Sequence, residues 1–139
     1  MSNLFKHIIF IISLYSCVSL QAQLQLNKIS GIEGLSQNTV KSIIQDSNGF
    51  IWVGTYNGIN KYDGYSMVHY NFSNDVNSLS SNIIISLFED KDGYIWAGTT
   101  DAGLNRIDPR TGKIDIYFDN PNAPDYVSVI DHIYQSSSG

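Results

Sequence analysis

A 21-residue segment occurs twice in this chain, and this repetition constrains the fold more than any other feature of the sequence. Residues 35–55 match residues 79–99 at an offset of 44, with identity at ten of the 21 positions. The match continues through Gly58-Ile-Asn and Gly103-Leu-Asn, where one inserted residue moves the offset to 45. A repeat of this length indicates a structural unit that buries its apolar face only against neighbouring copies.

Each copy predicts four short strands separated by turn residues. The turns Asp46–Gly49 and Asp90–Gly93 combine an Asx side chain, which binds turn amides, with a glycine that accepts positive φ. Four strands in a unit of this period are typical of a β-propeller blade. The predicted strands are 40–45, 50–55, 59–62 and 65–72 in the first copy and 83–89, 94–99, 104–107 and 113–118 in the second.

The repeat boundaries predict an all-β, partial β-propeller with two four-stranded blades and the start of a third. Gln23–Ser30 precedes Leu35 as the last strand of the first repeat precedes Leu79, so it is interpreted as an outer strand that closes a ring with later blades. Downstream blades of a longer parent chain are therefore expected partners. The predicted division is 23–34 for this closing strand and lead-in, 35–78 for repeat 1, 79–124 for repeat 2 and 125–139 for a truncated repeat 3.

The N-terminus has the pattern of an export signal. Lys6 and His7 precede a thirteen-residue apolar run, 8–20, which ends at Gln-Ala-Gln. The run is shorter than the roughly 20 residues that span a bilayer, so residues 1–22 are predicted to be a signal peptide that leads to the periplasm, with no membrane span beyond it. Cys17, the single cysteine, also ends a lipobox-like stretch, but Tyr15 fits that motif poorly and lipid anchoring is the less favoured alternative.

Composition narrows the expected partners. The chain has 42% hydrophobic and only 15% charged residues, which indicates a globular domain. Its net charge of -5 gives no electrostatic reason to bind nucleic acid or an anionic membrane. Neutral ligands therefore remain open.

Three short patterns recur together in both copies. They are Leu-Ser-x-Asn, Asp-x-x-Gly-x-Ile-Trp-x-Gly-Thr and Gly-Ile/Leu-Asn-Lys/Arg-x-Asp. Together they closely resemble the two-component regulator propeller repeat. The resemblance implies the N-terminal fragment of a periplasmic, ligand-sensing propeller from a hybrid sensor histidine kinase that regulates carbohydrate utilisation. It also implies that transmembrane, kinase and receiver segments would follow in the parent protein.

The residues that recur with the repeat are interpreted as structural. Trp52 and Trp96 are possible sugar platforms, but their repeated, apolar setting favours packing between blades. Loop residues that differ between the copies are better candidates for ligand contact, because a scaffold can vary its loops. The ligand candidates are Tyr56, Asn57, Thr100 and Asp101, and the structural set is Asp46, Gly49, Trp52, Gly54, Asp90, Gly93, Trp96 and Gly98.

No catalytic, metal or cofactor site is predicted. Asp90–Gly93 resembles part of an EF-hand loop but lacks the later glutamate. His69 and His132 lack the spacing of a zinc site. The chain is therefore expected not to be an enzyme.

Two alternatives to the sensor hypothesis stay open at this point. One is a short lectin in which several chains pool their blades into a ring. The other is a fragment of an extracellular propeller lyase or glycosidase, which would need carboxylate, His or Tyr groups in loops of particular blades.

Overall fold

The computed structural model describes residues 34–117 and 129–136, and within them the chain is all-β. Two antiparallel sheets have the strand orders β1-β2-β3-β4 and β5-β6-β7-β8, which confirms the predicted pair of four-stranded units. The strands are β1 (Val40–Gln45), β2 (Ile51–Thr55), β3 (Gly58–Tyr62), β4 (Met67–Tyr70), β5 (Ile84–Glu89), β6 (Ile95–Thr99), β7 (Leu104–Ile107) and β8 (Ile114–Tyr117).

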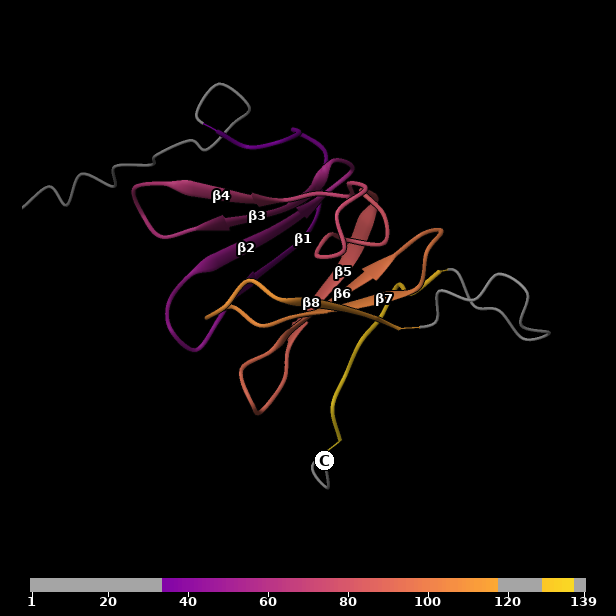
Figure 1. Ribbon diagram of the computed structural model, residues 1–139. Coiled ribbons are helices and arrows are strands. Elements are labelled where there is room, and N and C mark those ends of the chain that lie inside the picture. The colour runs from indigo at the N-terminus through magenta and orange to yellow at the C-terminus, as the bar shows by residue number, and fades with distance from the viewer. Residues whose placement is uncertain (1–33, 118–128, 137–139) are drawn as a thin grey trace, which may run out of the picture.

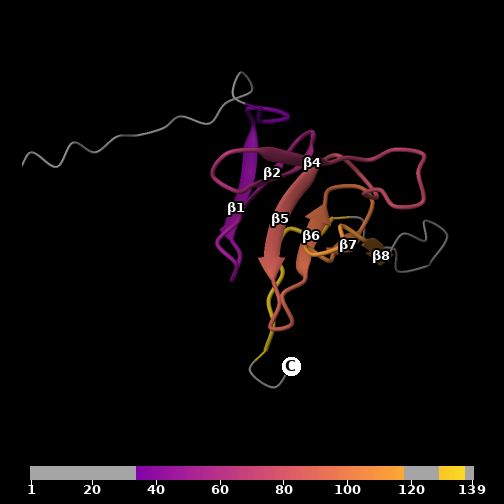
Figure 2. The same ribbon diagram turned by 60° about the vertical axis from the view of Figure 1, so that its left-hand side comes forward.

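The second sheet packs against one face of the first. Strand β5 contacts both β1 and β2, and Figures 1 and 2 show β1 and β5 running side by side where the sheets meet. The core lies between the sheets and takes two residues from the first, Trp52 and Ile59. The remaining core residues come from the second sheet and its lead-in, namely Leu79, Ile84, Leu87, Ile95, Ala97, Ile107 and Ile114.

An aspartate organises the first turn of each sheet. One oxygen of Asp46 accepts the amides of Asn48 and Phe50 at 3.0 and 2.9 Å, and the other accepts the indole N–H of Trp52 at 2.8 Å. Asp90 makes the same three contacts in the second sheet, including one of 2.7 Å from the Trp96 indole. The Asp and the Trp of the repeat therefore recur together because they are hydrogen-bonded to each other.

A buried asparagine ties the start of each unit to its third strand. The side-chain oxygen of Asn60 accepts the Ser36 amide at 2.8 Å, and that of Asn105 accepts the Ser80 amide at the same distance. Their side-chain nitrogens donate to the second strand, at Val53 and Ala97. This contact explains why the Leu-Ser and Gly-x-Asn patterns recur together.

The fourth strands are shorter than predicted. Strand β4 spans Met67–Tyr70 instead of 65–72, because Asp63 accepts the amides of Tyr65 and Ser66 and so extends the preceding turn. At its other end the Phe72 amide donates to the Asn82 side chain, which draws the chain out of the sheet. Side-chain acceptors in the connections therefore set the limits of this strand.

Residues 129–136 form no strand but lie against the second sheet. The Ile130 amide donates to the Thr99 carbonyl at 2.8 Å, and the Ile130 carbonyl accepts the Ser86 hydroxyl at 2.6 Å. The start of a third blade thus stays a prediction. The signal segment with Cys17 and the closing strand lie outside the described residues, in which no helix is long and apolar enough to cross a membrane.

Candidate functional site

The loops that carry the four candidate ligand residues lie at one end of the two sheets. Antiparallel strands place the β2–β3 and β6–β7 loops opposite the Asp-Gly turns. The two loops meet at adjacent residues of the β4–β5 connection, since Gly58 N–H donates to the Asn82 carbonyl at 2.7 Å and Thr100 N–H to the Ile83 carbonyl at 3.3 Å. We call this end, with residues 56–57, 71–83 and 100–103, the loop end.

Tyr56 and Asn57 project from a turn that Thr55 builds. The Thr55 hydroxyl accepts the Asn57 amide and donates to the Gly58 carbonyl, each at 3.0 Å. Asn57 uses its polar groups in hydrogen bonds within the protein. Its side chain donates to the Ser36 carbonyl, and its carbonyl accepts the Asn71 side chain. Tyr56 is 44% exposed, so it is the better placed of the two to meet a ligand.

A lysine lies over the exposed tyrosine ring. The Lys41 ammonium is 5.1 Å from the centroid of Tyr56, within the range of a cation–π contact. The contact holds the ring beside the start of β1 while leaving part of its surface open. This arrangement is suited to stacking against an uncharged, partly apolar ligand.

Thr100 and Asp101 occupy the matching loop of the second sheet. Thr99 repeats the role of Thr55, since its hydroxyl donates to the Gly103 carbonyl and accepts the Ala102 amide, both at 2.9 Å. Thr100 is half-buried and its amide is used in the contact with Ile83, whereas Asp101 is exposed. The structure thus brings both predicted pairs to the loop end.

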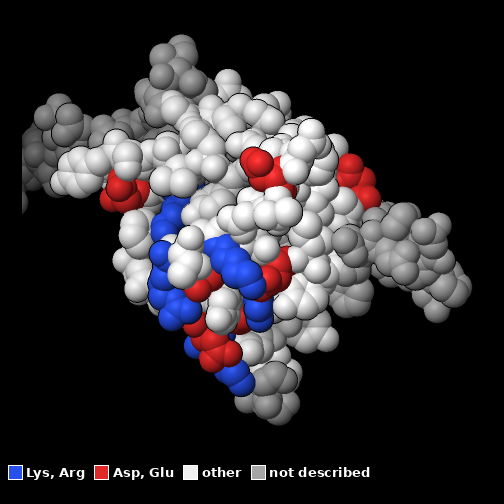
Figure 3. Space-filling view, in the orientation of Figure 1, with Lys and Arg blue, Asp and Glu red and all other residues white. Residues whose placement is uncertain are grey.

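Charged side chains gather at the opposite end, where the Asp-Gly turns lie. Figure 3 shows positive and negative groups interspersed there, while the rest of that face is mostly uncharged. Arg110 contacts Asp108 at 3.0 Å, and Asp115 accepts both Arg106 and Lys113 at 2.8 Å. Three cationic groups here pair with two carboxylates, so most of this charge is compensated.

The paired carboxylates predict a loss of stability in acid. Hydrogen bonds from the Arg110 side chain, then from its amide, lower the pKa of Asp108 to about 2 from 3.8. Because the folded pKa is the lower one, the stabilisation is complete above 3.8 and is lost as the pH falls towards 2. Urea titrations should give a smaller drop in unfolding free energy between about pH 6 and pH 3 for Asp108→Asn than for the unmodified chain. An equal drop in the variant and the unmodified chain would contradict the assignment of this acid sensitivity to Asp108.

His69 and His132 each have a single polar neighbour beside their Nδ1 atom. The Nδ1 of His69 lies 2.8 Å from the Asn60 side-chain oxygen, and that of His132 lies 3.4 Å from Asp131. Within residues 34–117 and 129–136, no three His, Cys, Asp or Glu side chains gather as metal ligands would.

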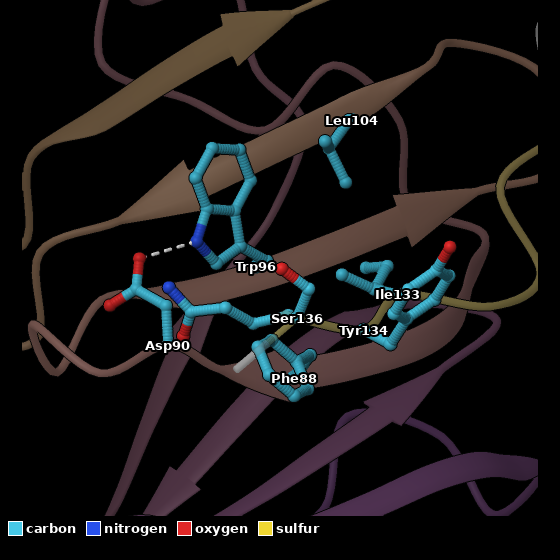
Figure 4. Close-up of a pocket in the computed structure, with 8 residues that line it drawn as sticks. Phe88, Asp90, Trp96, Leu104, Ile133, Tyr134 and Ser136 are labelled. Carbon is cyan, nitrogen blue, oxygen red and sulfur yellow. Dashed lines mark hydrogen bonds between the residues drawn. The ribbon is translucent and has the colours of Figure 1, made fainter. Parts of the chain in front are cut away.

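Sequence reasoning did not identify a hollow on the outer face of the second sheet. It has a volume of about 450 Å³ and is lined by Phe88, Asp90, Trp96, Leu104 and residues 133–136. Figure 4 shows the Trp96 indole beside the segment that carries Tyr134 and Ser136. Trp52 is buried against the second sheet, whereas no sheet within residues 34–117 and 129–136 lies against Trp96.

The two tryptophans have the same neighbours within their own sheets. Trp52 stacks on Tyr70 with ring centroids 5.6 Å apart, and Trp96 lies 5.4 Å from Tyr117. A cation covers an adjoining ring in each case, with Lys61 4.0 Å from Phe50 and Arg106 4.6 Å from Tyr94. Each sheet therefore presents an aromatic face of the same design.

Comparisons with known proteins agree with this geometry. The family model described as "two component regulator propeller" matches residues 34–57 and 78–101. A histidine kinase P4 of Formosa agariphila is 40% identical over 67 residues, which are 45% of this chain and 5% of the kinase.

Two solved structures from B. thetaiotaomicron are also similar. The extracellular domain of a putative hybrid two-component system superposes with a TM-score of 0.71 at 33% identity, over 81% of this chain and 16% of that domain. The extracellular domain of a putative one-component system gives 0.54 at 32% identity, over 68% of this chain and 13% of that domain. This chain thus spans a small part of each relative. Residues 34–57 and 78–101 are thus two repeats of the two-component regulator propeller family.

Proposed function

We propose that this chain forms part of the extracellular, ligand-sensing propeller of a two-component sensor histidine kinase. The observation that carries the proposal is the similarity of 81% of the chain to the extracellular domain of a putative hybrid two-component system. The sequence similarity to a histidine kinase supports it. In this proposal the chain is exported to the periplasm by residues 1–22 and has no catalytic role of its own.

The proposed sensor contains more blades than the two sheets described. The solved relative is several times longer than this chain, which covers only 16% of it. We propose repeats at 35–78 and 79–124 and a third repeat from residue 125, with residues 129–136 as its inner strand. The position of Ile130 supports this, since it lies beside Gly98 as Ile84 lies beside Gly54. Ligand binding would be transmitted to the kinase through movement of the whole propeller.

The ligand we propose is a neutral oligosaccharide bound at the loop end, so that the sensor regulates carbohydrate utilisation. An exposed aromatic ring stacks on the apolar face of a sugar, and Tyr56 is such a ring. Thr100 and Asp101 would supply polar contacts from the neighbouring loop. The interspersed charges lie at the other end of the sheets and do not impede an uncharged ligand.

Calorimetry with a panel of neutral oligosaccharides tests this proposal. Tyr56→Ala is expected to weaken binding about two- to thirteenfold, the loss that one aromatic contact of about 0.5–1.5 kcal/mol predicts. Tyr65→Ala is the matched control, because Tyr65 is 98% exposed but lies in the β3–β4 turn at the opposite end. Equal affinity of the two variants, or no binding by any neutral oligosaccharide, would contradict the assignment.

A further inference from the structure

The connection between β4 and β5 is held in place although much of it is exposed. Residues 72–77 are all exposed, and Figure 2 shows the connection projecting from the sheets on the side away from β1. Its two ends are joined, because the Leu79 amide donates to the Asn71 carbonyl at 3.3 Å. Inside it the Ser78 hydroxyl donates to the Ser73 carbonyl at 2.9 Å. The connection is therefore a compact loop of the Ω type, a class that is frequently functional.

The connection is also anchored to both sheets. The Asn71 side chain donates to the Asn57 carbonyl, in the loop of the first sheet, at 2.9 Å. The Asn77 side chain donates to the Gly112 carbonyl at 3.1 Å and accepts the Ile114 amide at 2.8 Å, next to the start of β8. The connection thus crosses the seam between two sheets that the structure describes, and hydrogen bonds fix its position from both sides.

Phe72 places an exposed ring on this fixed backbone. Its amide donates to the Asn82 side chain at 2.8 Å, and the Asn82 carbonyl accepts the Gly58 amide. Of the three phenylalanines that the structure describes, Phe72 alone is exposed, at 54%. Among the described residues it belongs neither to the core nor to the side chains packed against it. Packing of the core therefore does not account for an aromatic residue at this position.

Tyr56 and Phe72 are the two aromatic residues of the loop end, and both are exposed. Each is the neighbour in sequence of one partner in the hydrogen bond between Asn57 and Asn71. In the sheet, β3 lies between β2, which leads to Tyr56, and β4, which leads to Phe72. Because neighbouring strands are about 4.8 Å apart, the two residues are separated by about 10 Å. One sugar ring is too short to stack on both.

We propose that Phe72 is a second stacking residue of the loop end, and that the ligand is a neutral oligosaccharide with enough sugar units to reach both rings. The inference rests on the proposed function and narrows its ligand by length. Stacking suits Tyr56 and Phe72 because each ring is exposed while its backbone is held by hydrogen bonds, so binding requires little further ordering of the protein. Asn74 and Asp75, exposed in the same connection, offer polar groups to the sugar hydroxyls.

Tryptophan fluorescence reports contact at this position. Phe72→Trp places a fluorescent ring there, and its emission is expected to shift to shorter wavelength when a bound oligosaccharide excludes water from it. Val76→Trp is the matched control, because Val76 is an exposed apolar residue of the same connection, and its emission should not shift. The unmodified chain supplies the background of Trp52 and Trp96. An oligosaccharide that binds without shifting the emission of Phe72→Trp overturns the inference.

Calorimetry with length series of linear glucans, mannans and xylans, from the monosaccharide to the hexasaccharide, tests the proposed ligand length. The unmodified chain is expected to bind the longer members more tightly than the monosaccharide. Phe72→Ala is expected to weaken binding of the longer members about two- to thirteenfold, as loss of one aromatic contact predicts, and so to reduce the dependence on length. Phe72→Tyr keeps the ring and should bind as the unmodified chain does, and so should Val76→Ala.

Failure of this inference is distinguishable from failure of the proposed function. If Tyr56→Ala weakens binding and Phe72→Ala does not, or if all lengths bind equally, the role of Phe72 is overturned and the proposed function stands. If no member of any series binds to the unmodified chain, the proposed function fails and this inference fails with it.

Discussion

Replacing Trp52 by alanine is expected to lower the free energy of unfolding by about 3–5 kcal/mol, and the same change at Trp96 should cost less than about half of that. Trp52 is fully buried between the sheets, while Trp96 lines an open hollow. The contacts of the two rings within their own sheets are alike, including the bond from the indole to an aspartate. The difference therefore measures what the neighbouring sheet contributes. Urea titration followed by circular dichroism gives both values.

The comparison has a built-in control, because both variants lose the same side chain from the same position of the repeat. Tyr70→Leu and Tyr117→Leu extend it, since the rings of these residues contact the two tryptophans. Equal losses for Trp52→Ala and Trp96→Ala would mean that the two sheets do not share the interface described above.

The second large effect is expected at the aspartate of the first turn. Asp46→Ala should lower the free energy of unfolding by about 2–4 kcal/mol, because three N–H donors lose their acceptor. The indole N–H of Trp52 is buried and water cannot replace the carboxylate there. Asp46→Asn retains one acceptor oxygen and should cost less. Thermal unfolding should therefore rank the unmodified chain as most stable, Asp46→Asn next and Asp46→Ala as least stable.

Asp63 provides the matched comparison for this prediction. It also accepts two turn amides, but the turn is exposed and water can satisfy them. Asp63→Ala is therefore expected to cost less than about 1 kcal/mol. If Asp63→Ala destabilised the chain as much as Asp46→Ala, the burial of the indole bond would not be the cause.

Much of the fold could be predicted from the sequence because its signals are local. Strand β1 begins and ends where the pattern predicts, since the Asp46 turn that follows it contains its own acceptor and glycine. Strand β7 also has the bounds that the sequence predicts, and it ends directly before the turn at Asp108. Repetition strengthened these predictions, because each element could be read twice.

The features that were missed depend on contacts between distant segments. Nothing local indicates that the side chain and carbonyl of Asn57 are used by Ser36 and Asn71. The sequence likewise gives Trp52 and Trp96 the same surroundings, and only the order of the sheets makes one buried and the other partly open. The loops that carry the candidate ligand residues could thus be predicted, but the structure was needed to show that Tyr56 is exposed while the side chain of Asn57 is hydrogen-bonded within the protein.

A double-mutant cycle between Gly54 and Ile84 tests the contact between the two sheets most directly. A Cβ at Gly54 would lie 2.8 Å from the Cγ2 of Ile84, so Gly54→Ala should cost about 1–3 kcal/mol. In an Ile84→Ala background the added methyl group has room, and its cost should fall by about 1 kcal/mol or more. The predicted result is this favourable coupling. Strict additivity of the two substitutions would contradict the account that β5 packs on the first sheet as one propeller blade packs on the next.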